Sequence, residues 1–104
     1  MRPPNCEGSR VSETSVRARV LIHGHVQGVA YRAFARAAAL RCGVRGGVRN
    51  LTDGRVEAEA EGDRKAIEAF LECLKVGPPQ AKVDALDIEW QSPTGLPVDF
   101  RIWY

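Results

Sequence analysis

"RVEAEAEGDRKAIEAFLECLKVGPP", residues 55–79, changes its hydrophobic period halfway along. Up to Glu61 small apolar residues alternate with charged ones, which is the two-residue period of a strand with one buried face. Beyond Asp63, a predicted N-cap, the apolar residues fall at i, i+3, i+4 and i+7, the stripe of an amphipathic helix: Ile67, Phe70, Leu71 and Leu74. Gly77-Pro78-Pro79 ends that helix. The stretch therefore predicts a strand followed directly by a helix.

The same order, a strand followed by a helix, is predicted near the start of the chain. "VRARVLIH", residues 16–23, alternates as a strand with one buried face. "YRAFARAAALRC", residues 31–42, is rich in alanine and predicts a helix closed by Gly43. Its apolar stripe is expected to contain Phe34, Ala38 and Cys42.

Three more segments complete the predicted order of elements. Residues 44–50 predict a strand, although two adjacent glycines lower strand preference, and Asp53-Gly54 is a hairpin turn signal. Residues 82–90 predict another strand, and residues 98–104 a short final one. The order β-α-β-β-α-β with an extra C-terminal strand predicts the α+β class. The expected architecture is a ferredoxin-like sandwich, a mostly antiparallel sheet with two helices on one face.

The two faces of this sheet are expected to differ in character. Small residues point toward the helices and suit close packing: Ala18, Ala58 and Ala60. The opposite face is expected to be polar and solvated, with Arg17, Arg19, Arg55, Glu57 and Glu59, and with Glu61 at its end.

Length and composition indicate one ordinary globular domain. The chain has 104 residues and a formal net charge of +2, too small by itself to suggest a nucleic-acid or membrane partner. No apolar run approaches the roughly 18 residues of a membrane span. Residues 1–14 lack the apolar core of a secretory signal, so we interpret them as a flexible extension of a domain at residues 15–104. We expect a cytoplasmic monomer.

The three cysteines have no CxxC spacing. Cys6, Cys42 and Cys73 are interpreted as small buried hydrophobes in a reducing compartment. A disulfide between Cys42 and Cys73 is the alternative that remains open.

The loop "HGHVQGVAYR", residues 23–32, joins the first strand to the first helix and offers no usual base or nucleophile. Glycines allow the backbone to approach a ligand, and the N-terminus of a helix attracts anions. Arg32 adds a planar fork of donors suited to a phosphoryl group. The loop therefore predicts an anion site, although neither a Walker loop nor a GxGxxG pattern is present. The alternative is a plain glycine-bearing turn with a surface arginine.

The residues of this loop resemble the signature of the acylphosphatase family, Gly-x-Val-Gln-Gly-Val followed by a variable position, an aromatic residue and arginine. Residues 24–32 match it, with Tyr31 at the aromatic position. "GGVRN", residues 46–50, resembles the family's second signature, and Asn50 follows Arg32 by 18 residues. The resemblance extends over residues 16–104. Gly47 departs from it by replacing an aromatic residue, and Leu51 by replacing the threonine of some relatives.

The resemblance implies hydrolysis of small-molecule acyl phosphates to a carboxylate and inorganic phosphate. By this resemblance Arg32 binds the phosphoryl oxygens and Asn50 orients the attacking water. The backbone N–H groups of residues 25–29, which we call the cradle loop, complete the phosphate site: His25, Val26, Gln27, Gly28 and Val29. The resemblance implies no cofactor and no metal ion. The imidazoles of His23 and His25 are expected to be surface groups.

Two rival functions are weighed against hydrolysis. Acylphosphatase-like domains also occur in larger carbamoyl-transfer proteins, which suggests a non-catalytic module that binds acyl or carbamoyl phosphate. Those proteins continue into Cys-rich zinc motifs, which this sequence lacks, so an independent enzyme is favoured. RNA-recognition domains share the predicted element order but use aromatic residues on the open sheet face, where this chain has Arg17, Arg19, Glu57 and Glu59. We therefore expect no nucleic-acid partner.

Overall fold

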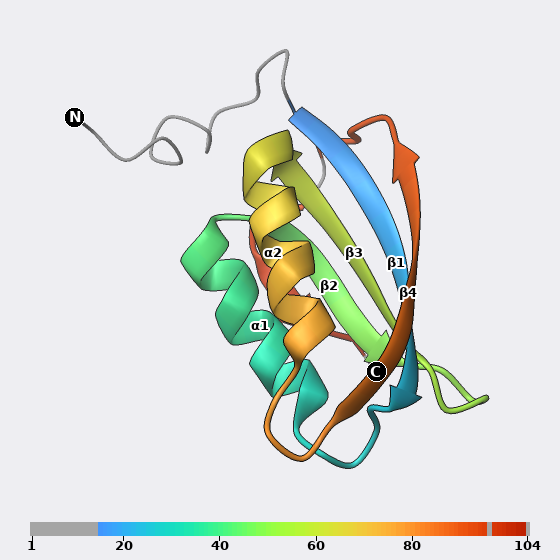
Figure 1. Cartoon of the computed structure of the whole chain (residues 1–104). Helices are drawn as coiled ribbons and strands as arrows, with labels where there is room; N and C mark the ends of the chain where they lie inside the picture. The colour runs from blue at the N-terminus through green and yellow to red at the C-terminus, as the bar shows by residue number, and fades with distance from the viewer. Residues whose placement is uncertain (1–14, 96, 104) are drawn as a thin grey trace.

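The computed structural model describes residues 15–95 and 97–103, so the predicted N-terminal extension at residues 1–14 lies outside the described residues. Seven elements follow in the predicted order (Figure 1): β1 (Ser15–His25), α1 (Tyr31–Cys42), β2 (Arg45–Asn50), β3 (Val56–Asp63), α2 (Arg64–Val76), β4 (Lys82–Gln91) and β5 (Phe100–Ile102). Neither helix in this described part is long and apolar enough to cross a membrane.

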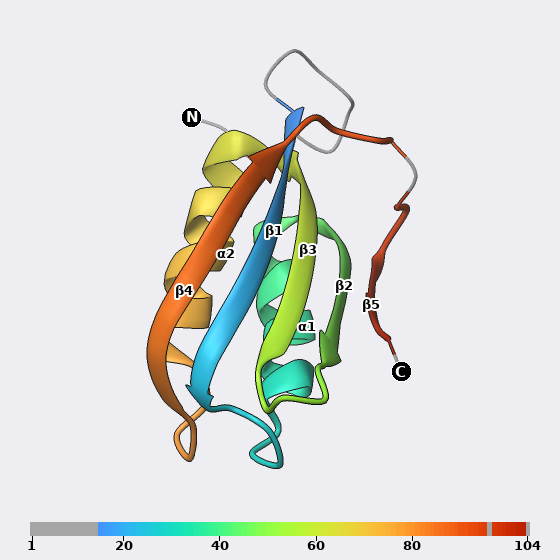
Figure 2. The same ribbon diagram turned by 90° about the vertical axis from the view of Figure 1, so that its right-hand side faces the viewer.

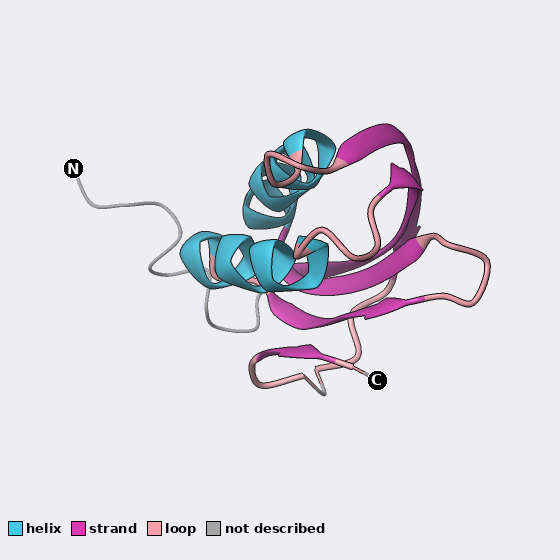
Figure 3. Cartoon of the chain, turned by 90° about the horizontal axis from the view of Figure 1, so that it is seen from below, coloured by secondary structure: helices cyan, strands magenta, loops and turns pink. Residues whose placement is uncertain are grey.

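The five strands form one sheet in the order β4-β1-β3-β2-β5 (Figure 2). β1 pairs antiparallel with β3 and β4, and β2 pairs antiparallel with β3. Only β5 is parallel to its neighbour, β2. Both helices lie on the same side of the sheet (Figure 3). The predicted ferredoxin-like sandwich is thus confirmed, including the short C-terminal strand.

The core lies between the helices and the inner face of the sheet. Most predicted inward residues of β1 and β3 are buried, and so is the stripe of α2: Ala18, Val20, Ile22, Val56, Ala58, Ala60, Ile67, Phe70, Leu71 and Leu74. Val16, at the start of the same face of β1, is only partly buried. Phe70 meets Phe100 of β5 edge to face, with ring centroids 5.5 Å apart. Each fully buried large side chain contributes roughly 1.5–3 kcal/mol, so β5 is held to the sandwich by its core contact as well as by its backbone.

The helix ends agree with the sequence in position. Asp63 occupies the N-cap of α2, but its side chain makes no capping hydrogen bond. Gly43 ends α1 in the left-handed conformation, with φ 76°, and its N–H donates to the carbonyl of Ala39 at 2.9 Å. Glycine adopts this conformation without a steric cost, which explains why the helix stops there.

The buried stripe of α1 differs from the predicted one. Its buried residues are Tyr31, Ala35, Ala38 and Ala39, whereas Phe34 and Cys42 are only half-buried. The ring of Phe34 packs beside that of Tyr31, 6.0 Å between centroids, at the edge of the core. An alanine-rich helix has weak amphipathic directionality, so its rotation is decided by the large side chain that enters the core, which is Tyr31.

The prediction of a solvated outer face is wrong for Glu57, whose residue is only 1% exposed. Arg19 donates to one oxygen of the carboxylate at 2.6 Å, and Arg49 donates to the other at 2.7 Å. These arginines stand on β1 and β2, on either side of Glu57, and their long side chains cover it. A buried carboxylate needs such partners, because an unpaired charge away from water is strongly destabilising.

Glu61, also 1% exposed, is covered by the chain that follows β4. It accepts hydrogen bonds from Arg17 and from the Thr94 hydroxyl, each 2.9 Å long, and from the backbone N–H of Gly95. Burial by itself raises the pKa of the Glu61 carboxyl, but these hydrogen bonds outweigh burial and lower it. The segment between β4 and β5 is therefore fastened to the outer face by a buried carboxylate.

Candidate active site at the β1–α1 loop

The cradle loop opens onto a pocket of about 180 Å³ at one end of the sheet. Its walls come from the loop, the start of α1 and the ends of β2 and β5: Val26, Gly28, Ala30, Tyr31, Arg32, Ala33, Asn50 and Ile102. The structure thus brings together Arg32 and Asn50, the two predicted catalytic residues. Of the other predicted residues, Val26 and Gly28 line the pocket, whereas His25, Gln27 and Val29 do not.

The backbone of the cradle loop is held in conformations that glycine favours. Gly28 has φ 75°, and a Cβ built on it would meet nothing within 4 Å, so conformation rather than crowding calls for glycine. Ala30 adopts φ 63° without being a glycine, at a cost of roughly 1–2 kcal/mol. Left-handed residues beside right-handed ones turn successive N–H groups to one side, which forms an anion-binding concavity. Backbone strain of this kind is typical of functional sites.

Gly24, just before the cradle loop, serves strand pairing. It lies at a register shift in the pairing of β1 with β4, and a Cβ on it would stand 2.1 Å from the carbonyl oxygen of Lys82. The residue is therefore required for close approach of two strands. Gly28, by contrast, lines the pocket.

Tyr31 fixes the start of α1, directly before Arg32. Its side chain is buried, and its hydroxyl donates to the backbone carbonyl of Leu74 at 2.6 Å. Leu74 lies in the last turn of α2, where carbonyls have no partner within the helix. Burial raises the pKa of the Tyr31 phenol, so the group stays protonated and remains a donor. The backbone at Arg32 is thereby anchored to the C-terminal end of α2.

Asn50 is the last residue of β2 and is exposed at the pocket. Its backbone position is set by antiparallel pairing with Val56 of β3. Within the part of the chain that the structure describes, its side-chain amide has no hydrogen-bond partner, so its donors and acceptor are available to a ligand or water.

The side chain of Gln27 does not line the pocket and contacts the hairpin between β2 and β3. Its amide nitrogen donates to the carbonyl of Leu51 at 2.7 Å and to that of Arg55 at 2.9 Å. Sequence reasoning gave Gln27 only a backbone role. Its partners are 24 and 28 residues away, and no local spacing marks such a contact.

The missing aromatic residue at Gly47 is replaced in space by Trp103. A Cβ on Gly47 would lie 2.1 Å from Cε2 of the indole, so the ring covers the strand at this point. The backbone N–H of Trp103 donates to the carbonyl of Val48 at 2.8 Å, which keeps the ring beside β2. An aromatic side chain from the C-terminal segment thus packs against the strand that carries Asn50.

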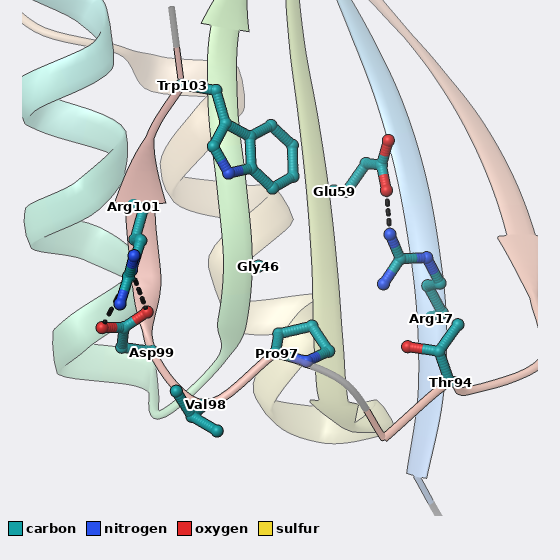
Figure 4. A pocket seen from close by; sticks show the side chains of 9 residues that line it. All are labelled: Arg17, Gly46, Glu59, Thr94, Pro97, Val98, Asp99, Arg101 and Trp103. Carbon is teal, nitrogen blue, oxygen red and sulfur yellow. Dashed lines mark hydrogen bonds and ion pairs between the residues drawn. The ribbon is translucent and has the colours of Figure 1, made fainter.

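A larger cavity of about 500 Å³ lies on the outer face of the sheet (Figure 4). Its two arginines are paired with carboxylates: Arg17 bonds Glu59, and Arg101 bonds Asp99 at 2.9 Å. These pairs leave no excess positive charge for an anion. Although the outer cavity is larger, the pocket at the cradle loop has the better chemistry for phosphate.

Fold and pocket together define a class of protein: a ferredoxin-like sandwich in which a glycine-bearing loop, an arginine in the first turn of a helix and an amide at the end of a strand line one pocket. The loop supplies N–H donors and the positive end of the helix dipole. The arginine and the amide supply the groups that phosphoryl chemistry uses.

Comparison with known proteins gives the family. The family profile described as Acylphosphatase matches residues 18–102. An acylphosphatase from Anaeromyxobacter dehalogenans (strain 2CP-C) is 52% identical over 80 residues, which are 77% of this chain and 86% of that relative. The crystal structure of acylphosphatase from Bacillus subtilis has a TM-score of 0.83 and 35% identity, covering 86% of this chain and 99% of that one. The chain belongs to the acylphosphatase family.

Part of a larger protein has a similar structure. The crystal structure of full-length HypF in the phosphate- and nucleotide-bound form matches with a TM-score of 0.78 and 28% identity. The match covers 91% of this chain but only 12% of that one.

Proposed function

We propose that the protein hydrolyses acyl phosphates to a carboxylate and inorganic phosphate in the pocket that Arg32 and Asn50 line. One observation carries the proposal: residues of separate elements, 18 positions apart, meet beside a loop of N–H donors. Membership of the acylphosphatase family supports the same reaction.

The phosphoryl group is bound by the backbone N–H groups of the cradle loop and by the Arg32 guanidinium. In a loose transition state, negative charge is spread over the equatorial phosphoryl oxygens. N–H dipoles and a guanidinium that are already in place stabilise this charge without reorganising, which is usually the largest catalytic contribution.

The Asn50 amide orients the attacking water. The oxygen of that water forms a bond to phosphorus, while the bond between phosphorus and the acyl oxygen breaks. The carboxylate leaves with the electron pair, and the water's proton passes to a phosphate oxygen. Because the leaving carboxylate has a conjugate acid with a pKa of about 4, it needs no general acid. The reaction thus relies on positioning and charge stabilisation, which explains a site without a base or nucleophile.

Benzoyl phosphate hydrolysis by purified variants tests the proposal. Arg32→Ala is expected to lose at least about 100- to 1000-fold in rate, the usual cost of one charge-stabilising donor. Asn50→Ala is expected to lower kcat while leaving inhibition by inorganic phosphate unchanged. Arg36→Ala is the matched control, because Arg36 lies one turn further along α1, exposed and outside the pocket. The proposed role of Arg32 would be contradicted if Arg32→Ala hydrolysed benzoyl phosphate as fast as Arg36→Ala does. The proposed role of Asn50 would be contradicted if Asn50→Ala kept the parent rate.

The second candidate is a non-catalytic module that binds acyl or carbamoyl phosphate. The similarity to one part of HypF favours it. In that case the parent protein binds inorganic phosphate in calorimetry but releases none from benzoyl or carbamoyl phosphate.

A further inference from the structure

We infer that Gln27 is a positioning residue for Asn50 in the hydrolysis proposed above, on which this inference rests. Its side chain is a bridge between the cradle loop and the hairpin that follows Asn50. The amide nitrogen contacts two backbone carbonyls, those of Leu51 at 2.7 Å and Arg55 at 2.9 Å. These carbonyls belong to the two ends of the hairpin between β2 and β3.

The orientation of the Gln27 amide follows from its neighbours. Both are carbonyl oxygens, which only accept hydrogen bonds, so the NH₂ end must face them. Both donors are then used, and only the acceptor oxygen of the amide is left. An acceptor oxygen repels a phosphoryl group, so the Gln27 side chain does not bind the substrate's phosphate. Its effect on the reaction has to pass through the hairpin.

The hairpin sets the position of Asn50. Leu51 follows it directly, and the N–H of Leu51 donates to the carbonyl of Arg55 at 2.8 Å. The N–H of Gly54 donates to the carbonyl of Leu51 at 3.2 Å. The Gln27 amide donates to the same two carbonyls, which also accept the hydrogen bonds that close this turn. Because the Asn50 side chain has no partner among the described residues, its place relative to the phosphate depends on its backbone.

Gln27 therefore connects the two halves of the site by a short path. It is adjacent to Gly28 in the loop that binds phosphate, and its partner Leu51 is adjacent to Asn50. The loop has its own anchor on the other side, since Val26 is buried in the core. Without the bridge, the phosphate-binding loop keeps its place while Asn50 gains freedom to move.

The test is a double-mutant cycle between Gln27→Met and Asn50→Ala, with benzoyl phosphate as substrate. Gln27→Met keeps the length of the side chain and removes both donors. A misplacement of about 1 Å can cost on the order of 100-fold, so we expect kcat to fall about 10- to 100-fold. The inhibition constant of inorganic phosphate should stay within about twofold. In the Asn50→Ala background, Gln27→Met should change kcat by less than about twofold, because the residue to be positioned is gone.

Controls separate positioning from a general structural effect. Gln80→Glu makes a substitution at an exposed glutamine outside the pocket and is expected to match the parent. Gln27→Asn keeps the amide but is one methylene too short to bridge, so it should behave as Gln27→Met does. Thermal unfolding of every variant verifies the fold.

Several outcomes would overturn the inference. An equal loss of kcat in both backgrounds would mean that Gln27 does not act through Asn50. A phosphate inhibition constant that rises with the loss of kcat would place its role in the cradle loop. Failure of both Gln27→Met and Gln27→Asn to fold would make the bridge a requirement of the fold. If the parent protein does not hydrolyse benzoyl phosphate, the proposed function itself is refuted. If Gln27→Met keeps the parent kcat while Asn50→Ala loses activity, only the present inference is refuted.

Discussion

Adding one methyl group at Gly47 is expected to destabilise the protein, because the Trp103 indole occupies the space where the methyl would go. The new Cβ would lie 2.1, 2.3 and 2.5 Å from three atoms of the ring. Carbon atoms in favourable contact are about 3.5–4.0 Å apart, so the indole must retreat by roughly 1–2 Å. Gly47 does not have a left-handed backbone, so crowding is the only penalty.

The size of the effect follows from two opposing contributions. Overpacking of this kind costs about 1–3 kcal/mol. Replacing glycine by alanine within a strand raises the free energy of unfolding by about 0.5–1 kcal/mol, because it lowers the backbone entropy of the unfolded chain. The net loss for Gly47→Ala should lie between about 0 and 2.5 kcal/mol, with a central value of about 1 kcal/mol. For a domain of this size, each kcal/mol lowers Tm by about 4–8 °C.

Urea and thermal unfolding of four proteins measure the effect: the parent, Gly47→Ala, Trp103→Ala and the double variant. Once the indole is gone, Gly47→Ala should be neutral or stabilising. Gly46→Ala is the control, because its Cβ would meet the backbone carbonyl of Glu59 at 1.9 Å and should destabilise with or without Trp103. Equal destabilisation by Gly47→Ala in both backgrounds, or none with Trp103 in place, would refute the reasoning.

Three other outcomes are expected. Tyr31→Phe should cost about 1–3 kcal/mol in urea unfolding, because the buried Leu74 carbonyl loses its donor; an unchanged midpoint would contradict this. Because the pKa of Glu61 is lowered on folding, this carboxylate stabilises the protein at pH values above its pKa in the unfolded chain, about 4.3. That stability is lost as the pH falls through the pKa of the folded state. Stability of Glu61→Gln should therefore vary less with pH in that window than stability of the parent. EDTA should leave benzoyl phosphate hydrolysis unchanged, whereas a loss restored by Mg²⁺ would show a need for metal.

Most of the fold could be predicted from local patterns. The change of period within residues 55–79 located β3 and α2, because a strand repeats every two residues and a helix every 3.6. The rotation of α1 could not be predicted in the same way. Its sequence offers alanine on several sides, so the buried stripe was decided by how Tyr31 entered the core.

The candidate site was predictable in its chemistry but only partly in its geometry. Arg32 and Asn50 were found from motifs, and the pocket contains both. The bridge made by Gln27 was missed because its partners are backbone carbonyls, which carry no sequence signal. The role of Gly24 was not predicted for a similar reason, since only the pairing with β4 reveals the carbonyl that excludes a side chain there.

The sequence by itself determined the order of elements and the fold class, and it predicted Arg32 and Asn50 as residues of one site, where the structure has them lining the same pocket. Such features are written in spacings of a few residues or in short motifs. Only the tertiary structure decided that Glu57 and Glu61 are buried, that Trp103 fills the space over Gly47, and that the Gln27 amide donates to the hairpin after Asn50. The physical reason is that burial and hydrogen bonding depend on which distant segments meet. The C-terminal segment and the hairpin after β2 reach their partners only once the sheet has formed.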